Sequence, residues 1–274
     1  MLHSIEALSL RVGVFDLGLS LENKKKIAHV CNFNCSIIDP GWCVSLPPTE
    51  NTPEYKKVFL AKPFIPNLFP GFSKYLWVDA DIWFQDCSAL EDYLEAADSS
   101  GIAICYEDHP LYQRSEKKRL PKILEQLRLK NESYKSKRLR KYFGRASARK
   151  WGDSPTLNSG IFCITAESSV WRHWQDTVRR ANLQGHEGKR LICDQTCLDL
   201  AVLENNLSPT KMPATHNWCL SLAAPMIQQD TGLLVDPIAP HLPIKVLHSI
   251  GSKKNYFGSL PNHRTSVDDN LCSQ

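Results

Sequence analysis

Two carboxylates, Asp79 and Asp81, follow the apolar run Tyr75 to Val78 and are separated by a single alanine. Four bulky residues in a row are typical of a strand that is buried on both faces of a parallel sheet. Ligands of open α/β sheets bind beyond the carboxyl ends of the strands. Two like charges there repel each other, and a divalent cation such as Mg²⁺ or Mn²⁺ removes that cost. The alternative is a strand end whose acids meet a helix N-terminus or solvent, and Asp-x-Asp alone favours that alternative.

A second pattern lies near the end of the chain, where His248, Gly251 and Lys254 form His-x-x-Gly-x-x-Lys. An Asp-x-Asp after an apolar strand, followed late by this pattern, resembles glycosyltransferase family 8 and its relatives with the GT-A fold. Other motifs occur in the order typical of that family: Phe15 to Ser20, Lys62 to Pro66, Leu157 to Ile161 and Asp194-Gln195. The resemblance spans residues 12 to 256. Each motif alone is unspecific, whereas the whole set in this order is specific.

The resemblance implies a metal ion bound by Asp79, Asp81 and His248. A histidine among carboxylates favours Mn²⁺, with Mg²⁺ as the second choice. The alternative for His248 is a satisfied histidine at a strand end. Gly251 would let the backbone approach the diphosphate of a nucleotide sugar, because a Cβ there would clash. Lys254 would place a positive charge on the same diphosphate.

Further donor contacts are implied at Lys62, Asn158 and Ser159. Lys62 matches a basic residue in the helix that precedes the Asp-x-Asp strand, and a solvated helix lysine is the alternative. Asn158 and Ser159 belong to an Asn-Ser-Gly turn whose asparagine would hydrogen-bond sugar hydroxyls. A purely structural turn explains these two residues equally well. Glu107 and Asp108 end a neighbouring strand and are lesser candidates for donor binding.

The catalytic residues implied by the resemblance are Asp194 and Gln195. Enzymes of this family retain the anomeric configuration, and in the favoured mechanism the leaving phosphate accepts the proton of the acceptor. Gln195 would then steady the positively charged sugar through its carbonyl, and Asp194 would bind a sugar hydroxyl. An aspartate at a helix N-terminus is also a common cap, which is the structural alternative for Asp194.

The elements that must position these residues alternate between strands and helices, which predicts a mostly parallel sheet flanked by helices. We expect strands at 10–15, 36–38, 75–78, 101–106, 159–165 and 245–250, and helices at 22–30, 55–68, 90–97, 168–181 and 194–203. Pro63 and Pro66 should kink or break the second of these helices. The resemblance implies a Rossmann-like GT-A fold. The chain departs from the family pattern because it leaves no room for the usual first strand, so we expect either an N-terminally truncated sequence or a protein that has lost part of its base-binding floor. We expect one domain over residues 1–274.

Composition and cysteine usage bear on class and compartment. The 274 residues can bury a sizeable core, and no apolar run approaches the ~20 residues of a membrane-spanning helix. The ten cysteines are scattered, without the paired Cys-x-x-Cys spacing of a zinc site. We therefore expect a cytoplasmic protein, although a luminal enzyme without its anchor would look similar.

Positive charge is concentrated in a helical insertion at about residues 112–150. The segment 114–150 contains fifteen basic and three acidic residues, whereas the rest of the chain contains 18 basic and 26 acidic residues. This segment could bind an acidic acceptor or an anionic membrane surface, and a solvated pair of basic helices is the plainest alternative. Nucleic acid is not the expected partner.

Three functions compete on the sequence. The first is a retaining, metal-dependent glycosyltransferase that uses a nucleotide sugar, expected to be UDP-linked. The sequence does not identify its acceptor, for which a cell-surface glycan and a lipid-linked glycan are the candidates. The second is a non-catalytic sugar- or partner-binding descendant of the fold. The third is a haloacid dehalogenase-type phosphatase, whose first motif is also an apolar strand ending in Asp-x-Asp. That third function is the least favoured, because the Asp-x-Asp strand of such phosphatases normally opens the domain.

Overall fold

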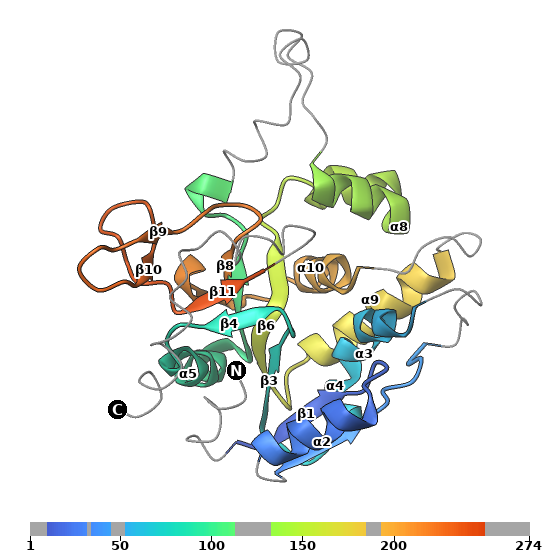
Figure 1. The fold of residues 1–274 in the computed structure, drawn as a ribbon. Helices are drawn as coiled ribbons and strands as arrows, with labels where there is room; N and C mark the ends of the chain where they lie inside the picture. The colour runs from blue at the N-terminus through green and yellow to red at the C-terminus, as the bar shows by residue number, and fades with distance from the viewer. Residues whose placement is uncertain (1–9, 32–33, 45–52, 113–132, 185–192, 250–274) are drawn as a thin grey trace, which may run out of the picture.

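The computed structural model describes residues 10–31, 34–44, 53–112, 133–184 and 193–249 (Figure 1). The strands are β1 Val12–Phe15, β2 Cys35–Ile38, β3 Lys74–Val78, β4 Ile82–Phe84, β5 Ile102–Tyr106, β6 Leu157–Thr165, β7 Thr210–Met212, β8 Trp218–Cys219, β9 Met226–Ile227, β10 Leu234–Val235 and β11 Val246–His248. The α-helices are α2 Leu21–Val30, α3 Lys57–Ala61, α4 Ile65–Leu68, α5 Ser88–Ser100, α8 Tyr134–Trp151, α9 Val170–Gln184 and α10 Asp194–Glu204. Short 3₁₀ turns are η2 Glu54–Lys56, η3 Lys62–Phe64 and η4 Ala214–His216.

The central sheet has the strand order β3-β6-β5-β7. Strand β6 pairs antiparallel with both β3 and β5, and β5 pairs parallel with β7. The α/β class is therefore confirmed, but the expectation of a mostly parallel sheet is wrong for the described strands. The reason is that β6 begins where β5 ends, with Leu157 opposite Tyr106, so the chain runs back along its neighbour.

Helices cover both faces of this sheet, as expected. Alternate residues of β5 and β6 point to opposite faces, because the side-chain period of a strand is two. One face packs on α9 and α10 through Ile102, Ile104, Phe162 and Ile164. The other face packs on α5 through Ala103, Cys105, Ile161 and Cys163. In Figure 1, α5 lies on one side of β6, and α9 and α10 lie on the other.

The helical segment before β3 is broken by its prolines, as the sequence predicts. It forms α3, the turn η3 at Lys62 and the short helix α4 instead of one continuous helix. Proline at 63 and 66 lacks the N–H that a helix interior requires. The break leaves Lys62 in a turn whose side chain reaches the end of β3, with its Nζ 2.9 Å from Asp79 Oδ1.

Strand β3 is less enclosed than its apolar sequence predicts. Only Tyr75 is buried, and its neighbours Leu76 and Trp77 are half-buried, so the prediction of a strand buried on both faces is wrong.

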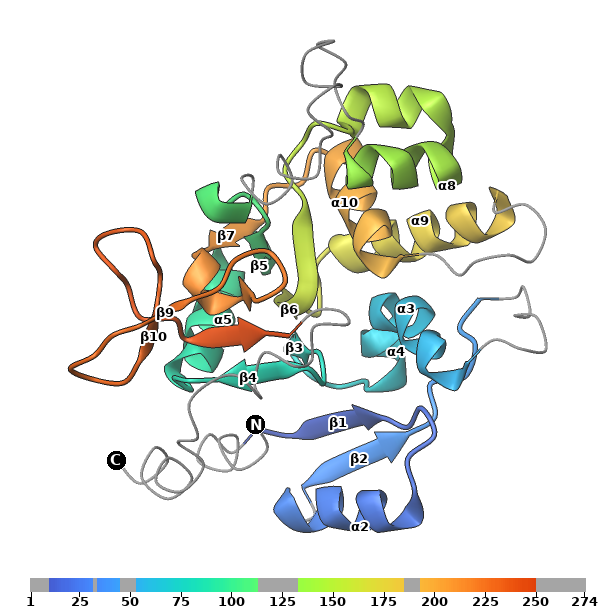
Figure 2. The same cartoon turned by 45° about the horizontal axis from the view of Figure 1, so that its top comes forward.

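Within the described residues β3 is the end strand of its sheet, and β1 and β2 form a separate parallel pair (Figure 2). A cavity of about 290 Å³ lies between β1, β2 and β3. The missing first strand stays a prediction, because residues 1–9 lie outside the described residues.

The basic segment is described only in its second half. Helix α8 carries eight lysines and arginines and no acid, and a left-handed Gly144 (φ 84°) divides it. Residues 113–132, which make up most of the first half of this segment, lie outside the described residues. None of the described helices is long and apolar enough to cross a membrane.

Candidate active site

Two backbone ladders bring the acids of the Asp-x-Asp motif next to His248. Asp79 and Asp81 lie in the turn between β3 and β4, and the Asp79 N–H donates to the Gly160 carbonyl of β6 at 2.8 Å. Strand β4 pairs with β11 so that His248 lies opposite Ile82. The next residue, Ser249, donates its N–H to the Asp81 carbonyl at 3.0 Å. The position of His248 therefore follows from strand register.

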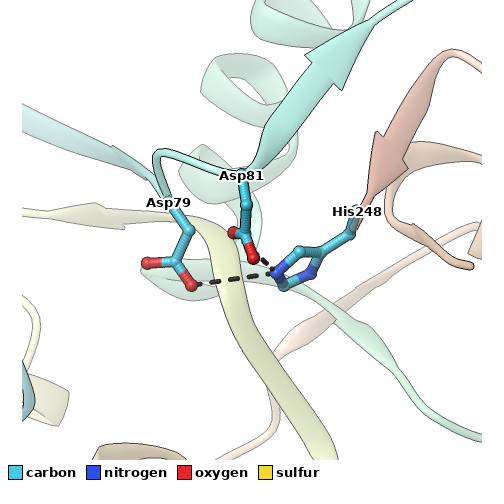
Figure 3. A group of neighbouring side chains, drawn as sticks. All are labelled: Asp79, Asp81 and His248. Atoms are coloured by element: carbon cyan, nitrogen blue, oxygen red, sulfur yellow. Dashed lines mark ion pairs between the residues drawn. The ribbon is translucent and has the colours of Figure 1, made fainter. Parts of the chain in front are cut away.

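The three side chains converge on one point (Figure 3). His248 Nε2 lies 3.4 Å from Asp81 Oδ1 and 3.9 Å from Asp79 Oδ2. One ligand atom from each residue lies within 4.8 Å of the other two. Trp77 Nε1 donates to Asp79 Oδ1 at 2.7 Å, which leaves the other oxygen of Asp79 directed at His248. Two carboxylates and one imidazole nitrogen are a donor set that fits a divalent cation.

Lys62 is the buried cation of the site. Its side chain is 3% exposed, and its Nζ lies 2.9 Å from both Asp79 Oδ1 and Asp194 Oδ2. Burial disfavours the charged form, but the two carboxylates outweigh it and raise the lysine pKa above its ordinary value. The alternative of a solvated helix lysine is therefore wrong. Lys62 joins the Asp-x-Asp turn to the start of α10.

Asp194 uses its side chain inside the site instead of capping its helix. It is the first residue of α10, and the N-cap position belongs to Cys193, which makes no side-chain cap bond. Its Oδ2 accepts from Lys62 and from the hydroxyl of Ser159, the latter at 3.1 Å. The N-terminus of α10 also favours the negative charge. The capping alternative is thus not what the structure shows.

Asn158 is enclosed by protein groups and is 1% exposed. Its Nδ2 donates to Glu107 Oε1 at 2.8 Å and to Cys219 Sγ at 3.3 Å. Its Oδ1 accepts from the Gly160 N–H and from Asn217 Nδ2. This arrangement favours the structural alternative for the turn over a direct contact with a donor sugar. Ser159 is also buried and is occupied by Asp194.

Gln195 and Glu107 lie next to each other on the same side of the site. Gln195 is half-buried, and its Nε2 donates to Glu107 Oε1 at 3.2 Å. Asp108 is instead engaged with Lys211 at 2.5 Å. The remaining predicted donor contacts, Gly251 and Lys254, lie outside the described residues.

Asn217 belongs to the site and was missed by sequence reasoning. It is 2% exposed, follows η4, and its Oδ1 lies 3.0 Å from His248 Nδ1. No spacing or motif distinguishes this asparagine from others in loops. A polar residue directly before the apolar Trp218 was the only available signal.

Comparisons with known proteins give structural similarities only. No protein-family model and no curated protein matches the chain. Mouse xyloside xylosyltransferase 1 in its apo form is similar at 14% identity and a TM-score of 0.45, covering 90% of this chain and 91% of that one. The galactosyltransferase LgtC in complex with donor and acceptor sugar analogues is similar at 14% identity and a TM-score of 0.49, covering 91% and 83%. An active-site mutant of LgtC is similar at 14% identity and a TM-score of 0.47, covering 92% and 83%.

By their names these solved structures are glycosyltransferases. At 14% identity and TM-scores below 0.5, the likeness says nothing about the site of this chain. The chemistry of the site must therefore come from the residues of this chain.

Proposed function

We propose that this chain is a retaining, divalent-metal-dependent glycosyltransferase that transfers a sugar from a nucleotide sugar to an acceptor, for which a cell-surface glycan and a lipid-linked glycan are the candidates. The observation that carries the proposal is the convergence of Asp79, Asp81 and His248 beside the buried Lys62–Asp194 ion pair. Mn²⁺ is the preferred cation because the donor set includes an imidazole. A UDP-linked donor is proposed from the resemblance to family 8.

Departure of a nucleoside diphosphate leaves negative charge on the phosphates and positive charge on the sugar. A divalent cation bound by Asp79, Asp81 and His248 would act as a Lewis acid on the diphosphate, worth several kcal/mol. Lys62 and Trp77 fix one oxygen of Asp79, so the ligand group is oriented before any donor binds. Gly251 and Lys254 are assigned to the diphosphate by the resemblance.

The contacts with the transferred sugar are assigned to Asp194 and Gln195, the first two residues of α10. The leaving phosphate accepts the proton of the acceptor hydroxyl on the face that it vacates, so retention requires no strong protein nucleophile. Gln195 presents its amide carbonyl to the positive sugar, with its orientation fixed by Glu107. Asp194 would bind a sugar hydroxyl through the oxygen that Lys62 and Ser159 do not occupy.

The proposal includes the organisation of the chain. Residues 1–274 form one domain, with 112–150 as an insertion whose helix α8 packs on α9 and α10. A cytoplasmic location, with peripheral contact to anionic membrane through 114–150, stays a prediction from the sequence.

Asp81→Asn tests the proposal, because the Asp81 side chain is 42% exposed and its loss should not unfold the chain. We expect Mn²⁺-dependent UDP binding, measured by calorimetry, to weaken by at least ~10–100-fold, the loss that even outer-shell changes cause. Hydrolysis of nucleotide sugars should fall in parallel. Asp98→Asn is the matched control, since Asp98 of α5 is an exposed acid that pairs with Lys74 of β3.

Two results would contradict the proposal. Unchanged UDP binding in Asp81→Asn would remove this residue from the metal site. A wild-type chain that binds neither Mn²⁺ nor any nucleotide sugar would support the non-catalytic descendant instead.

A further inference from the structure

The two nitrogens of His248 face different surroundings. Nε2 faces Asp79 and Asp81, and Nδ1 lies 3.0 Å from Asn217 Oδ1. A neutral imidazole has its hydrogen on one nitrogen and a lone pair on the other. The tautomer therefore decides whether Nε2 can serve as a ligand.

A chain of hydrogen bonds with fixed ends sets this tautomer. At one end the Gly160 backbone N–H can only donate, and the Asn158 side-chain atom at 3.0 Å is therefore its oxygen. The nitrogen of Asn158 then points to Glu107 Oε1 at 2.8 Å, and a carboxylate oxygen accepts. Both ends agree on the orientation of the Asn158 amide.

The orientation passes from Asn158 to Asn217. The Asn217 atom that lies 2.9 Å from Asn158 Oδ1 must be a donor, so it is Nδ2. The other amide atom of Asn217 is then Oδ1, which faces His248 Nδ1. Because Oδ1 can only accept, the ring hydrogen has to be on Nδ1.

We propose that Asn217 is a positioning residue that holds His248 in the Nδ1–H tautomer, with the Nε2 lone pair directed at Asp79 and Asp81. Gly160 completes the arrangement, because a Cβ at this position would overlap the ring, with three ring atoms within 2.9 Å. Only the consequence for metal affinity rests on the proposed function. The tautomer itself is a property of the metal-free chain.

Nitrogen-15 NMR of the histidine-labelled, metal-free full chain reads the tautomer directly. At pH values where the His248 ring carries a single proton, we expect that proton on Nδ1 and an unprotonated Nε2, assigned by the signals that vanish in His248→Gln. Asn217→Leu, which keeps similar volume without an acceptor, should lose this preference. Asn217→Asp keeps an acceptor toward Nδ1 and should retain it. Asn205→Leu is the control, because Asn205 donates to Ala201 at the end of α10, outside this chain of hydrogen bonds.

Mn²⁺ affinity is the second readout, for which we expect a loss of roughly 10–100-fold in Asn217→Leu and a smaller loss in Asn217→Asp. An unchanged tautomer in Asn217→Leu, or an Nε2–H tautomer in the wild-type chain, would overturn the inference. A wild-type chain with the Nδ1–H tautomer but without Mn²⁺ binding would contradict the proposed function and leave the role of Asn217 standing. If Asn217→Leu fails to fold, retention of the tautomer by Asn217→Asp supports the inference, and its loss overturns it.

Discussion

Lys62 is the residue on which the electrostatics of the site depend. A buried ammonium is costly unless it is paired, and Lys62 is paired with Asp79 and Asp194 and also donates to the Ser159 carbonyl. The same pairing compensates two carboxylates that would otherwise lie in a poorly hydrated site. Removal of the lysine would therefore leave uncompensated charge.

We expect Lys62→Met to lower the free energy of unfolding by about 3–5 kcal/mol, the range for a broken buried ion pair. Chemical denaturation followed by circular dichroism measures it. Lys74→Met in β3 is the matched control, because its partner Asp98 is exposed and ion pairs with exposed partners contribute at most ~1 kcal/mol. Equal losses in the two variants would mean that the Lys62 pairs contribute no more than a surface ion pair.

Gly160→Ala should disturb His248, because the added Cβ would overlap the imidazole ring. Overpacking in a core costs roughly 1–3 kcal/mol, and displacement of a ligand should also lower Mn²⁺ affinity by at least ~10-fold. Gly13→Ala in β1 is the matched control, since its Cβ would come within 2.8 Å of the Phe69 ring, which follows α4. It should lose stability but not Mn²⁺ affinity. Calorimetric titration with Mn²⁺ shows whether the loss of affinity is specific to Gly160→Ala or follows from any overpacked glycine. An equal loss of Mn²⁺ affinity in both variants would contradict the prediction.

At the scale of elements, the junction of α8, α10 and β6 supports the strand that carries Asn158. Asp199 on α10 accepts from the Leu157 N–H at 2.8 Å, and its other oxygen lies 3.4 Å from Lys135 of α8. Burial raises the pKa of Asp199 to about 7, although Lys135 and the Leu157 N–H act in the opposite direction. Lys135 also donates to the Pro155 carbonyl at 2.8 Å, so α8 is tied to the entry of β6.

This junction predicts a pH dependence of stability. A carboxyl pKa that is higher in the folded state means that the folded chain binds the proton more tightly. The resulting stabilisation is complete below the unfolded value of 3.8 and is lost as the pH rises to about 7. We subtract the unfolding free energy of Asp199→Asn from that of the wild type. This difference should fall as the pH rises through the range, by at most ~1.4 kcal/mol per pH unit, and become flat above it. Denaturation series at several pH values measure it, and a difference that is flat or rises between these values would contradict the assignment.

At the scale of the whole molecule, positive charge is segregated from the rest of the chain. Within the described residues this charge lies on α8, whose Lys137, Lys141, Arg145, Arg149 and Lys150 are exposed. Figure 1 places α8 on the side of the molecule opposite to β1 and α2. Contact with an anionic surface through α8 therefore stays a prediction from the sequence, and a solvated basic helix stays its alternative.

We expect the chain to bind vesicles that contain acidic lipids, and the binding to weaken as salt screens the charges. Changing Arg145, Arg149 and Lys150 to Gln should cost about 1 kcal/mol per residue, or roughly 100-fold in affinity for all three. The same change at Lys24 to Lys26 of α2 is the control and should have little effect. Vesicle co-sedimentation measures it, and salt-insensitive binding or none would favour the solvated-helix alternative.

The sequence by itself determined those features that depend on local chemistry. Pro63 and Pro66 break the helix before β3, and apolar runs mark β5 and β6. It also identified Asp79, Asp81 and His248 as residues that belong together, through a resemblance in motif order. Helix boundaries and buried runs are set by neighbours in the chain, so they can be read from it.

Only the tertiary structure decided which partner each of these side chains has. The direction of β6, the pairing of β4 with β11, and the burial of Lys62 between Asp79 and Asp194 depend on long-range packing. Strands of two or three residues, such as β8 and β9, have too little periodicity to be predicted from pattern. The role of Asn217 has the same origin, because a hydrogen bond to His248 follows from register between β8 and β11, which no local property of an asparagine encodes.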